Sequence, residues 1–145
     1  IFDIDEHVSK EAARYIAAEG PDVSWVYLEF TDDIGHKFGD SPLMDEAVEL
    51  ADVQVGRIWE AVKKREKEHG EEWMIIVTTD HGRERRTGRG HGGQSNRERA
   101  TWLVTNQKGN FSEAVPIVDI LPSMIDFLGI NLPDSISKQL AGQSF

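Results

Sequence analysis

The chain has 145 residues, of which 39% are hydrophobic and none is cysteine, so it is typical of one globular domain or part of one and excludes disulfides and thiolate metal ligands. Its 16 Lys and Arg residues against 26 Asp and Glu residues give a formal net charge of −10, which disfavours a nucleic-acid polymer as partner and requires any phosphate-bearing ligand to be held by local groups. No apolar run reaches the roughly 18 residues that a membrane-spanning helix needs.

Helical periodicity marks three segments of the chain. Residues 4–19 place apolar side chains at intervals of three and four, and Gly20-Pro21 ends this helix. Residues 42–69 form a long amphipathic stretch that begins at Ser41-Pro42, with an N-cap and a first-turn proline, and ends at Gly70. Residues 117–128 predict a third helix, with Pro122 in its first turns.

Three short apolar runs, residues 25–30, 73–79 and 101–105, predict buried strands between these helices. Strands that alternate with helices indicate an α/β fold with a mainly parallel sheet flanked by helices. We expect residues 1–145 to form a single partial domain, with an irregular surface segment from residue 131 onward. Sheets of this kind bind their ligands at the carboxyl ends of the strands.

Acidic and imidazole side chains follow the first two predicted strands. Asp32 and His36 come after the first strand, and a tight bend at the intervening Gly35 could turn both side chains toward the same point. Asp80 and His81 come directly after the second strand. His91 lies in a glycine-rich loop that follows, where little backbone crowding hinders approach to an ion. These five side chains offer only oxygen and nitrogen ligands, which suits zinc, or manganese at lower affinity. The sequence therefore predicts a metal centre.

Each of these motifs also has a simpler explanation. Asp and Gly are ordinary turn residues, so either the Asp32 motif or the Asp80 motif alone is weak support for a metal. The combination is stronger, because three of the five histidines lie beside glycine in predicted loops. His7 and His69 lie on or at the end of predicted helices and need only a surface or capping role.

Four arginines lie between the second and third clusters of an otherwise acidic chain: Arg83, Arg85, Arg86 and Arg89. Their guanidinium groups could bind a phosphate or a nucleotide leaving group through bidentate hydrogen bonds. The alternative is that they pair with Glu84, Glu98 and other surface acids.

Three motifs carry a family resemblance, in the order and at the separations seen here: Glu29-Phe30-Thr31-Asp32-x-x-Gly35-His36, Thr79-Asp80-His81-Gly82 and Gly90-His91-Gly92. They resemble the alkaline phosphatase superfamily, especially its nucleotide pyrophosphatase/phosphodiesterase-like branch. Residues 118–124 and 140–145 also resemble the C-terminal part shared with sulfatases, so the resemblance covers roughly residues 23 to 145.

The resemblance implies two divalent metals, zinc in the first place and manganese as the alternative. It assigns Asp32, His36 and His91 to one metal and Asp80 and His81 to the second. The family completes the second site with an aspartate from its first strand, followed by a Thr or Ser nucleophile at a helix start, and neither is identifiable here. We therefore expect an internal start at Ile1, a missing N-terminal half that carries the nucleophile, and no activity of the chain alone.

The function implied by the resemblance is metal-dependent hydrolysis of a small phosphate ester by a two-metal mechanism, of the phosphodiesterase/nucleotide pyrophosphatase or phosphatase type. A sulfatase-like or phosphomutase relative is an alternative, because these enzymes share the metal scaffold. A non-catalytic, metal-stabilised binding module is a third. The resemblance also favours a periplasmic or secreted location, which the lack of cysteine does not oppose.

Overall fold

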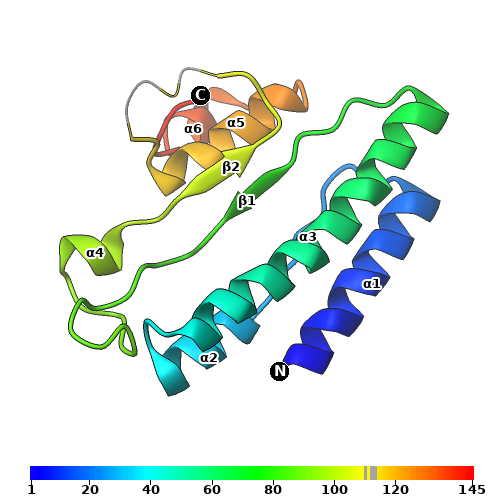
Figure 1. Cartoon of the computed structure of the whole chain (residues 1–145). Coiled ribbons are helices and arrows are strands. Elements are labelled where there is room, and N and C mark those ends of the chain that lie inside the picture. The colour runs from blue at the N-terminus through cyan, green and yellow to red at the C-terminus, as the bar shows by residue number, and fades with distance from the viewer. Residues whose placement is uncertain (110, 112–113) are drawn as a thin grey trace. The chain divides into compact units, whose positions relative to one another are not determined.

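The computed structural model describes residues 1–109, 111 and 114–145, which divide into two compact units (Figure 1). Ile1–Trp73 and His81–Ala100 form the first unit, and Met74–Asp80 and Thr101–Phe145 form the second. The first unit contains the helices α1 (Phe2–Glu19), α2 (Phe30–Phe38), α3 (Pro42–His69) and α4 (Asn96–Arg99). The second contains β1 (Ile76–Thr78), β2 (Leu103–Thr105), the 3₁₀ turn η1 (Ile117–Asp119), α5 (Ile120–Phe127) and α6 (Asp134–Ser137).

The first unit is built on α1 and α3, which lie side by side and run in the same direction (Figure 1). A partly buried polar cluster lies between them: Arg57 of α3 donates from Nη1 to Ser9 Oγ at 2.5 Å and from Nη2 to Glu6 Oε1 at 2.8 Å. Ser9 and Gln54 are fully buried here. Such satisfied polar contacts fix the register of the two helices, which apolar packing alone would leave looser. The buried apolar side chains of the unit are mostly small: Ala13, Ile16, Ala47, Ala61 and Val62.

The carboxyl end of α1 packs against an ion pair at the carboxyl end of α3. The Arg65 guanidinium passes against Gly20, where an added Cβ would lie 2.3 Å from its Nη2, and it pairs with Glu71. Gly20 also ends α1 in the left-handed region, at φ 56°, which glycine adopts without strain. The hydrogen bond from Arg65 lowers the pKa of Glu71 to about 2.

Two of the three predicted helices are confirmed as continuous helices, α1 and α3, and both end at a left-handed glycine as predicted. The third is confirmed as η1 followed by α5. The segment from residue 131 is irregular as predicted, apart from the short α6. No helix within the described residues is long and apolar enough to cross a membrane.

The strand predicted for residues 25–30 is wrong. The chain from residue 21 to residue 29 contains no strand, and Phe30 already begins α2. A strand exists only with a partner in a hydrogen-bonded ladder, and an apolar run does not supply that partner. As a result Asp32 and His36 lie on a helix rather than in a bend after a strand.

The other two predicted strands are confirmed in shortened form, as β1 and β2. They pair in an antiparallel ladder, with Ile76 opposite Thr105 and Thr78 opposite Leu103. The α/β class therefore stands, whereas the mainly parallel sheet is not confirmed by the strands that the structure describes. The expected single partial domain stays a prediction.

The C-terminal residues of the second unit are fixed by two buried polar side chains that flank the start of α5. Asp119 Oδ1 accepts the Gln143 N–H at 2.9 Å, and Ser123 Oγ accepts the Phe145 N–H at 3.1 Å. Ser123 Oγ in turn donates to the carbonyl oxygen of Asp119 at 2.8 Å. The end of the chain is thus hydrogen-bonded to α5 although it forms no regular element.

Candidate metal centre

Helix α2 carries Asp32 and His36 one turn apart, so both side chains lie on the same face. His36 Nε2 lies 3.3 Å from Asp32 Oδ2. The helical spacing therefore achieves the convergence that the sequence attributed to a bend at Gly35.

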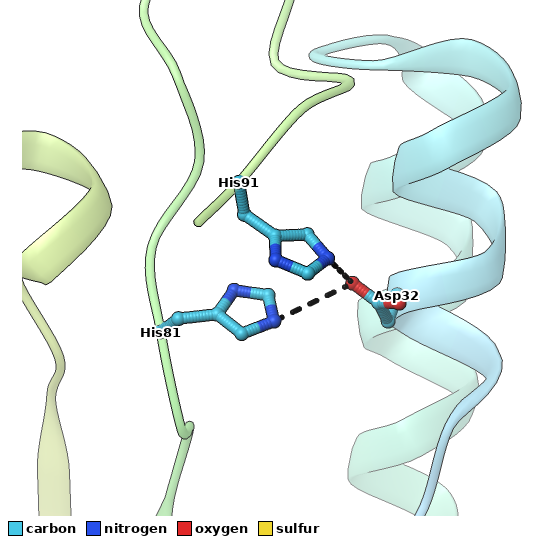
Figure 2. A group of neighbouring side chains, drawn as sticks. All are labelled: Asp32, His81 and His91. Carbon is cyan, nitrogen blue, oxygen red and sulfur yellow. Dashed lines mark ion pairs between the residues drawn. The ribbon is translucent and has the colours of Figure 1, made fainter. Parts of the chain in front are cut away.

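Two histidines from the segment after Asp80 complete the group. His81 Nε2 lies 3.8 Å and His91 Nε2 lies 3.7 Å from Asp32 Oδ1, and Figure 2 shows both rings pointing at this carboxylate. The two imidazoles are stacked, with ring centroids 3.7 Å apart. His36 Nε2 also lies 3.0 Å from His91 Nε2. One carboxylate and three imidazoles thus meet at one place.

The spacing of these atoms fits a small divalent cation. Zinc binds nitrogen and oxygen at about 2.0–2.1 Å, so ligand atoms at tetrahedral corners lie roughly 3.3–3.4 Å apart. The four distances just given, from 3.0 to 3.8 Å, bracket that value. Ligand atoms of Asp32, His81 and His91 all lie within 4.8 Å of one another. The donor set, one carboxylate and neutral imidazoles, is also the one that zinc prefers when no thiolate is present.

The structure brings together four of the five predicted ligands: Asp32, His36, His81 and His91. Asp80, the fifth, follows β1 and belongs to the second unit, whereas the other four belong to the first. His36 and His81 both approach the Asp32–His91 pair, so either could complete a three-ligand set. The division of the five ligands between two metals stays a prediction.

Arg83 holds the segments of the candidate site together. Its Nη2 donates to Asp32 Oδ1 and, at 2.8 Å, to the Asp32 carbonyl oxygen, while its Nη1 donates to the Arg89 carbonyl oxygen at 3.1 Å. A Cβ on Gly35 would lie 2.3 Å from Arg83 Cζ, so only glycine lets the guanidinium lie this close to α2. Predicted as a phosphate-binding residue, Arg83 here links α2 to the loop that carries His91.

Glu84 shapes the loop that carries the other arginines. Its carboxylate accepts hydrogen bonds from the Thr87 hydroxyl and from the Thr87 N–H at 2.9 Å, and also from the N–H groups of Arg86 and Arg89. These donors, the Thr87 hydroxyl foremost, lower the pKa of Glu84 to about 2. The loop is therefore closed by one carboxylate acting on backbone groups rather than on guanidinium groups.

Glu98, fourteen residues further along the chain, acts in the same way. It forms a capping box with Ser95 at the start of α4 and accepts the Gly93 N–H at 2.9 Å. The Ser95 hydroxyl and then this N–H lower the pKa of Glu98. Glu84 and Glu98 were the alternative partners considered for the loop arginines, but neither carboxylate pairs with an arginine side chain in the described residues. Within the described residues, Arg85, Arg86 and Arg89 are exposed and their side chains make no hydrogen bond or ion pair.

Three features of the site were missed by sequence reasoning. The meeting of His81 with His91 and the link formed by Arg83 depend on tertiary contacts and left no local signal. The Ser95-x-x-Glu98 spacing, in contrast, is a capping-box pattern that could have been recognised.

Comparison with known proteins places the chain in a family. The family described as "Type I phosphodiesterase / nucleotide pyrophosphatase" matches residues 3–138. The chain belongs to this family, within the alkaline phosphatase superfamily, so the resemblance noted in the sequence is confirmed. Its members are metal-dependent enzymes of phosphoryl transfer.

Two curated relatives are similar over part of the chain, and both are named 2,3-bisphosphoglycerate-independent phosphoglycerate mutase. The one from Onchocerca volvulus is 27% identical over 100 residues, which cover 63% of this chain and 18% of the relative. The one from Brugia malayi is 26% identical over 102 residues, which cover 65% and 19%. The chain thus spans about a fifth of the length of these relatives. No solved structure gives a significant match.

The lowered pKa of Glu84 predicts how the loop responds to acid. Because this pKa is about 2 in the folded chain, against an ordinary value of 4.5, the stabilisation by Glu84 is complete above about pH 4.5 and is lost as the pH falls through 2. We expect carbon NMR of the side-chain carboxyls to show Glu84 still ionised at pH 3.5, below the ordinary glutamate pKa of 4.5. Glu84→Gln should accelerate amide exchange at Thr87, and Glu72→Gln should not. A Glu84 carboxyl that titrates near 4.5 would contradict the loop geometry.

Proposed function

We propose that the chain is the metal-binding part of a metal-dependent hydrolase of phosphate esters, of the phosphodiesterase/nucleotide pyrophosphatase or phosphatase type. The observation that carries this proposal is the convergence of Asp32, His36, His81 and His91 at ligand spacing, in a chain that belongs to a phosphodiesterase family. The chain works as part of a longer protein, in which a Thr or Ser upstream acts as the nucleophile.

In this proposal Asp32, His36 and His91 hold one divalent cation, and Asp80 and His81 contribute to a second. Zinc is the first choice, and manganese is the alternative. Bound cations would supply Lewis-acid stabilisation of the phosphoryl oxygens and activate the attacking hydroxyl.

The protein groups themselves define what binding requires. Because the 3.0 Å contact joins two Nε2 atoms, one of them, on His36 or on His91, carries a proton while no cation is held. For both atoms to hold a cation, that proton would have to leave, so cation binding would weaken as the pH falls. Asp32 contributes the negative charge, and its hydrogen bonds to Arg83 keep the carboxylate turned toward the three imidazoles.

The exposed arginines fit the substrate part of the proposal. Arg85, Arg86 and Arg89 leave the Glu84-closed loop with guanidinium groups that no described acid neutralises. In a chain of net charge −10 they offer the local positive charge that a phosphate ester needs. Arg83, from the same predicted set, is held by Asp32 in this structure and would have to leave it to reach a substrate.

A phosphomutase is the second candidate, because both curated relatives carry a phosphoglycerate mutase name. Hydrolase and mutase would use the same ligand set and differ in what accepts the phosphoryl group. A sulfatase-like enzyme and a non-catalytic metal-stabilised module remain alternatives, and upstream residues or assays would separate them.

Zinc binding by the chain tests the metal assignment. We expect calorimetry to detect one tight zinc site, because Asp32, His36 and His91 form a complete three-ligand set while the Asp80–His81 site lacks a partner. His36→Ala or His91→Ala should weaken zinc binding by about tenfold or more. Loss of a residue that only hydrogen-bonds a metal ligand already costs about that much affinity, so loss of a ligand should cost at least as much. His69→Ala is the matched control and should bind normally. Two equally tight zinc sites would contradict the assignment.

Turnover by the longer protein tests the reaction class. With zinc or manganese bound, we expect release of p-nitrophenol from its phosphate mono- or diester, and His36→Ala should abolish it. Conversion of one phosphoglycerate isomer to the other without net phosphate release would instead support the mutase. Absence of turnover on all of these substrates, from a metal-loaded protein, would support the non-catalytic module.

The arginine loop predicts an effect on substrate affinity. In the same protein, Arg85→Ala, Arg86→Ala and Arg89→Ala combined should raise KM roughly tenfold with kcat little changed, because the loss is one of ground-state binding. Arg14→Ala, an exposed arginine on α1, serves as the control. A triple variant with an unchanged KM would remove the substrate-binding role.

A further inference from the structure

The amino end of α2 is capped by a residue from another helix. The N-cap residue Glu29 makes no capping bond with its own side chain. Instead, Asp5 Oδ2 of α1 accepts the N–H of Glu29 at 2.8 Å and the N–H of Phe30 at 2.7 Å. The first N–H groups of a helix have no partner within the helix, so this carboxylate satisfies two donors that the segment cannot satisfy itself.

Asp5 is held firmly enough to act as an anchor. It is only 3% exposed and lies on the face of α1 that packs on α3. Ser9, one turn away, and the adjacent Glu6 bind Arg57 of α3, which fixes α1 against rotation about its axis. At the same junction the rings of Phe2 and Phe30 meet edge to face, with centroids 5.2 Å apart.

The helix that Asp5 caps is the one that carries two metal ligands. Asp32 lies in the first turn of α2 and His36 in its second, so the direction of both side chains follows from where the helix starts and how it is rotated. A start displaced by one residue would rotate them by about 100° around the helix axis, away from His81 and His91.

We propose that Asp5 is a positioning residue of the metal centre. Its carboxylate fixes the start of α2 and thereby aims Asp32 and His36 at the imidazoles of the 81–91 segment. Asp5 is not assigned as a ligand: it is buried, its Oδ2 accepts two backbone N–H groups, and it lies outside the group of described side chains that could hold a metal. The metal-binding consequence rests on the proposed function, whereas the capping consequence does not.

Three variants of the chain test this proposal. Asp5→Ala removes the acceptor, and Asp5→Asn keeps one acceptor oxygen in nearly the same place. Asp3→Ala, on the same turn of α1 but exposed, is the matched control. Each is compared with the wild type in two measurements, one without metal and one with it.

Without metal, amide hydrogen exchange is measured along α2 and α3. In Asp5→Ala the amides of α2 should exchange roughly tenfold faster relative to those of α3, in line with the loss of a helix cap. Asp5→Asn and Asp3→Ala should leave this ratio within about twofold of the wild type. Equal acceleration in both helices, which marks a merely global loss of stability, would overturn the proposal.

With metal, zinc affinity is measured by calorimetry and the ligand geometry by the visible absorption of bound cobalt. Asp5→Ala should bind zinc roughly tenfold more weakly and with a changed cobalt spectrum, as expected when the support of a ligand is lost. Asp5→Asn should restore both. Wild-type affinity and spectrum in a folded Asp5→Ala chain would overturn the positioning role.

The two ideas fail in different ways. A wild-type chain that binds neither zinc nor cobalt would contradict the proposed function. The exchange measurement alone would then decide whether Asp5 fixes the start of α2. If Asp5→Ala does not fold, Asp5→Glu moves the carboxylate outward by one methylene. The proposal expects Asp5→Glu to fold with weakened zinc binding, and unchanged affinity and exchange in that variant would refute it.

Discussion

The site depends on one carboxylate. Four basic groups, the Nε2 atoms of three histidines and the Arg83 guanidinium, lie within hydrogen-bonding or ion-pair distance of Asp32. Such a gathering of potential positive charge is unfavourable without a negative centre, and Asp32 supplies it. The same carboxylate joins α2 to the 81–91 segment, which lies about fifty residues further along the chain. His36 also contacts His91, and Arg83 donates to the Asp32 carbonyl oxygen, so several contacts join the two segments and the Asp32 carboxylate lies at their centre.

Around this centre, two adjacent residues with opposite charges have complementary roles. Arg83 turns inward and binds a side chain and backbone carbonyls, whereas Glu84 turns back on its own loop and binds backbone N–H groups. Between them they satisfy the polar backbone of a segment that has no regular structure. The remaining arginines are consequently directed outward, and the loop presents cations beside a site that would hold cations of its own. An anionic group bound between the arginines and the metal site would reduce the electrostatic repulsion between these positive charges.

The sequence predicted the long helices α1 and α3 well, missed α2 and predicted the β-structure poorly, for a physical reason. Periodicity, the Ser41-Pro42 start and the terminal glycines act within a few residues, so they located α1 and α3 correctly. Strand pairing and direction depend on contacts between distant segments, and the antiparallel ladder of β1 and β2 could not be read locally. The Asp32-x-x-x-His36 spacing fits a bend or a helical turn equally well. It therefore identified the ligand pair without revealing its geometry, while the role of Arg83 needed the fold itself.

The attachment of Glu29 and Phe30 to Asp5 explains why residues 21–29 form neither a helix nor a strand. The chain leaves α1 at Gly20 and must return to Asp5, fifteen helical residues back, which is a distance of about 22 Å. Nine residues of helix would cover only about 14 Å, whereas nine extended residues reach about 30 Å. The connection is thus a tether whose conformation is set by the distance it spans. Deletion of more than about two residues would make it too short and would break the hydrogen bonds from the start of α2 to Asp5. Inserted residues could instead form a longer loop.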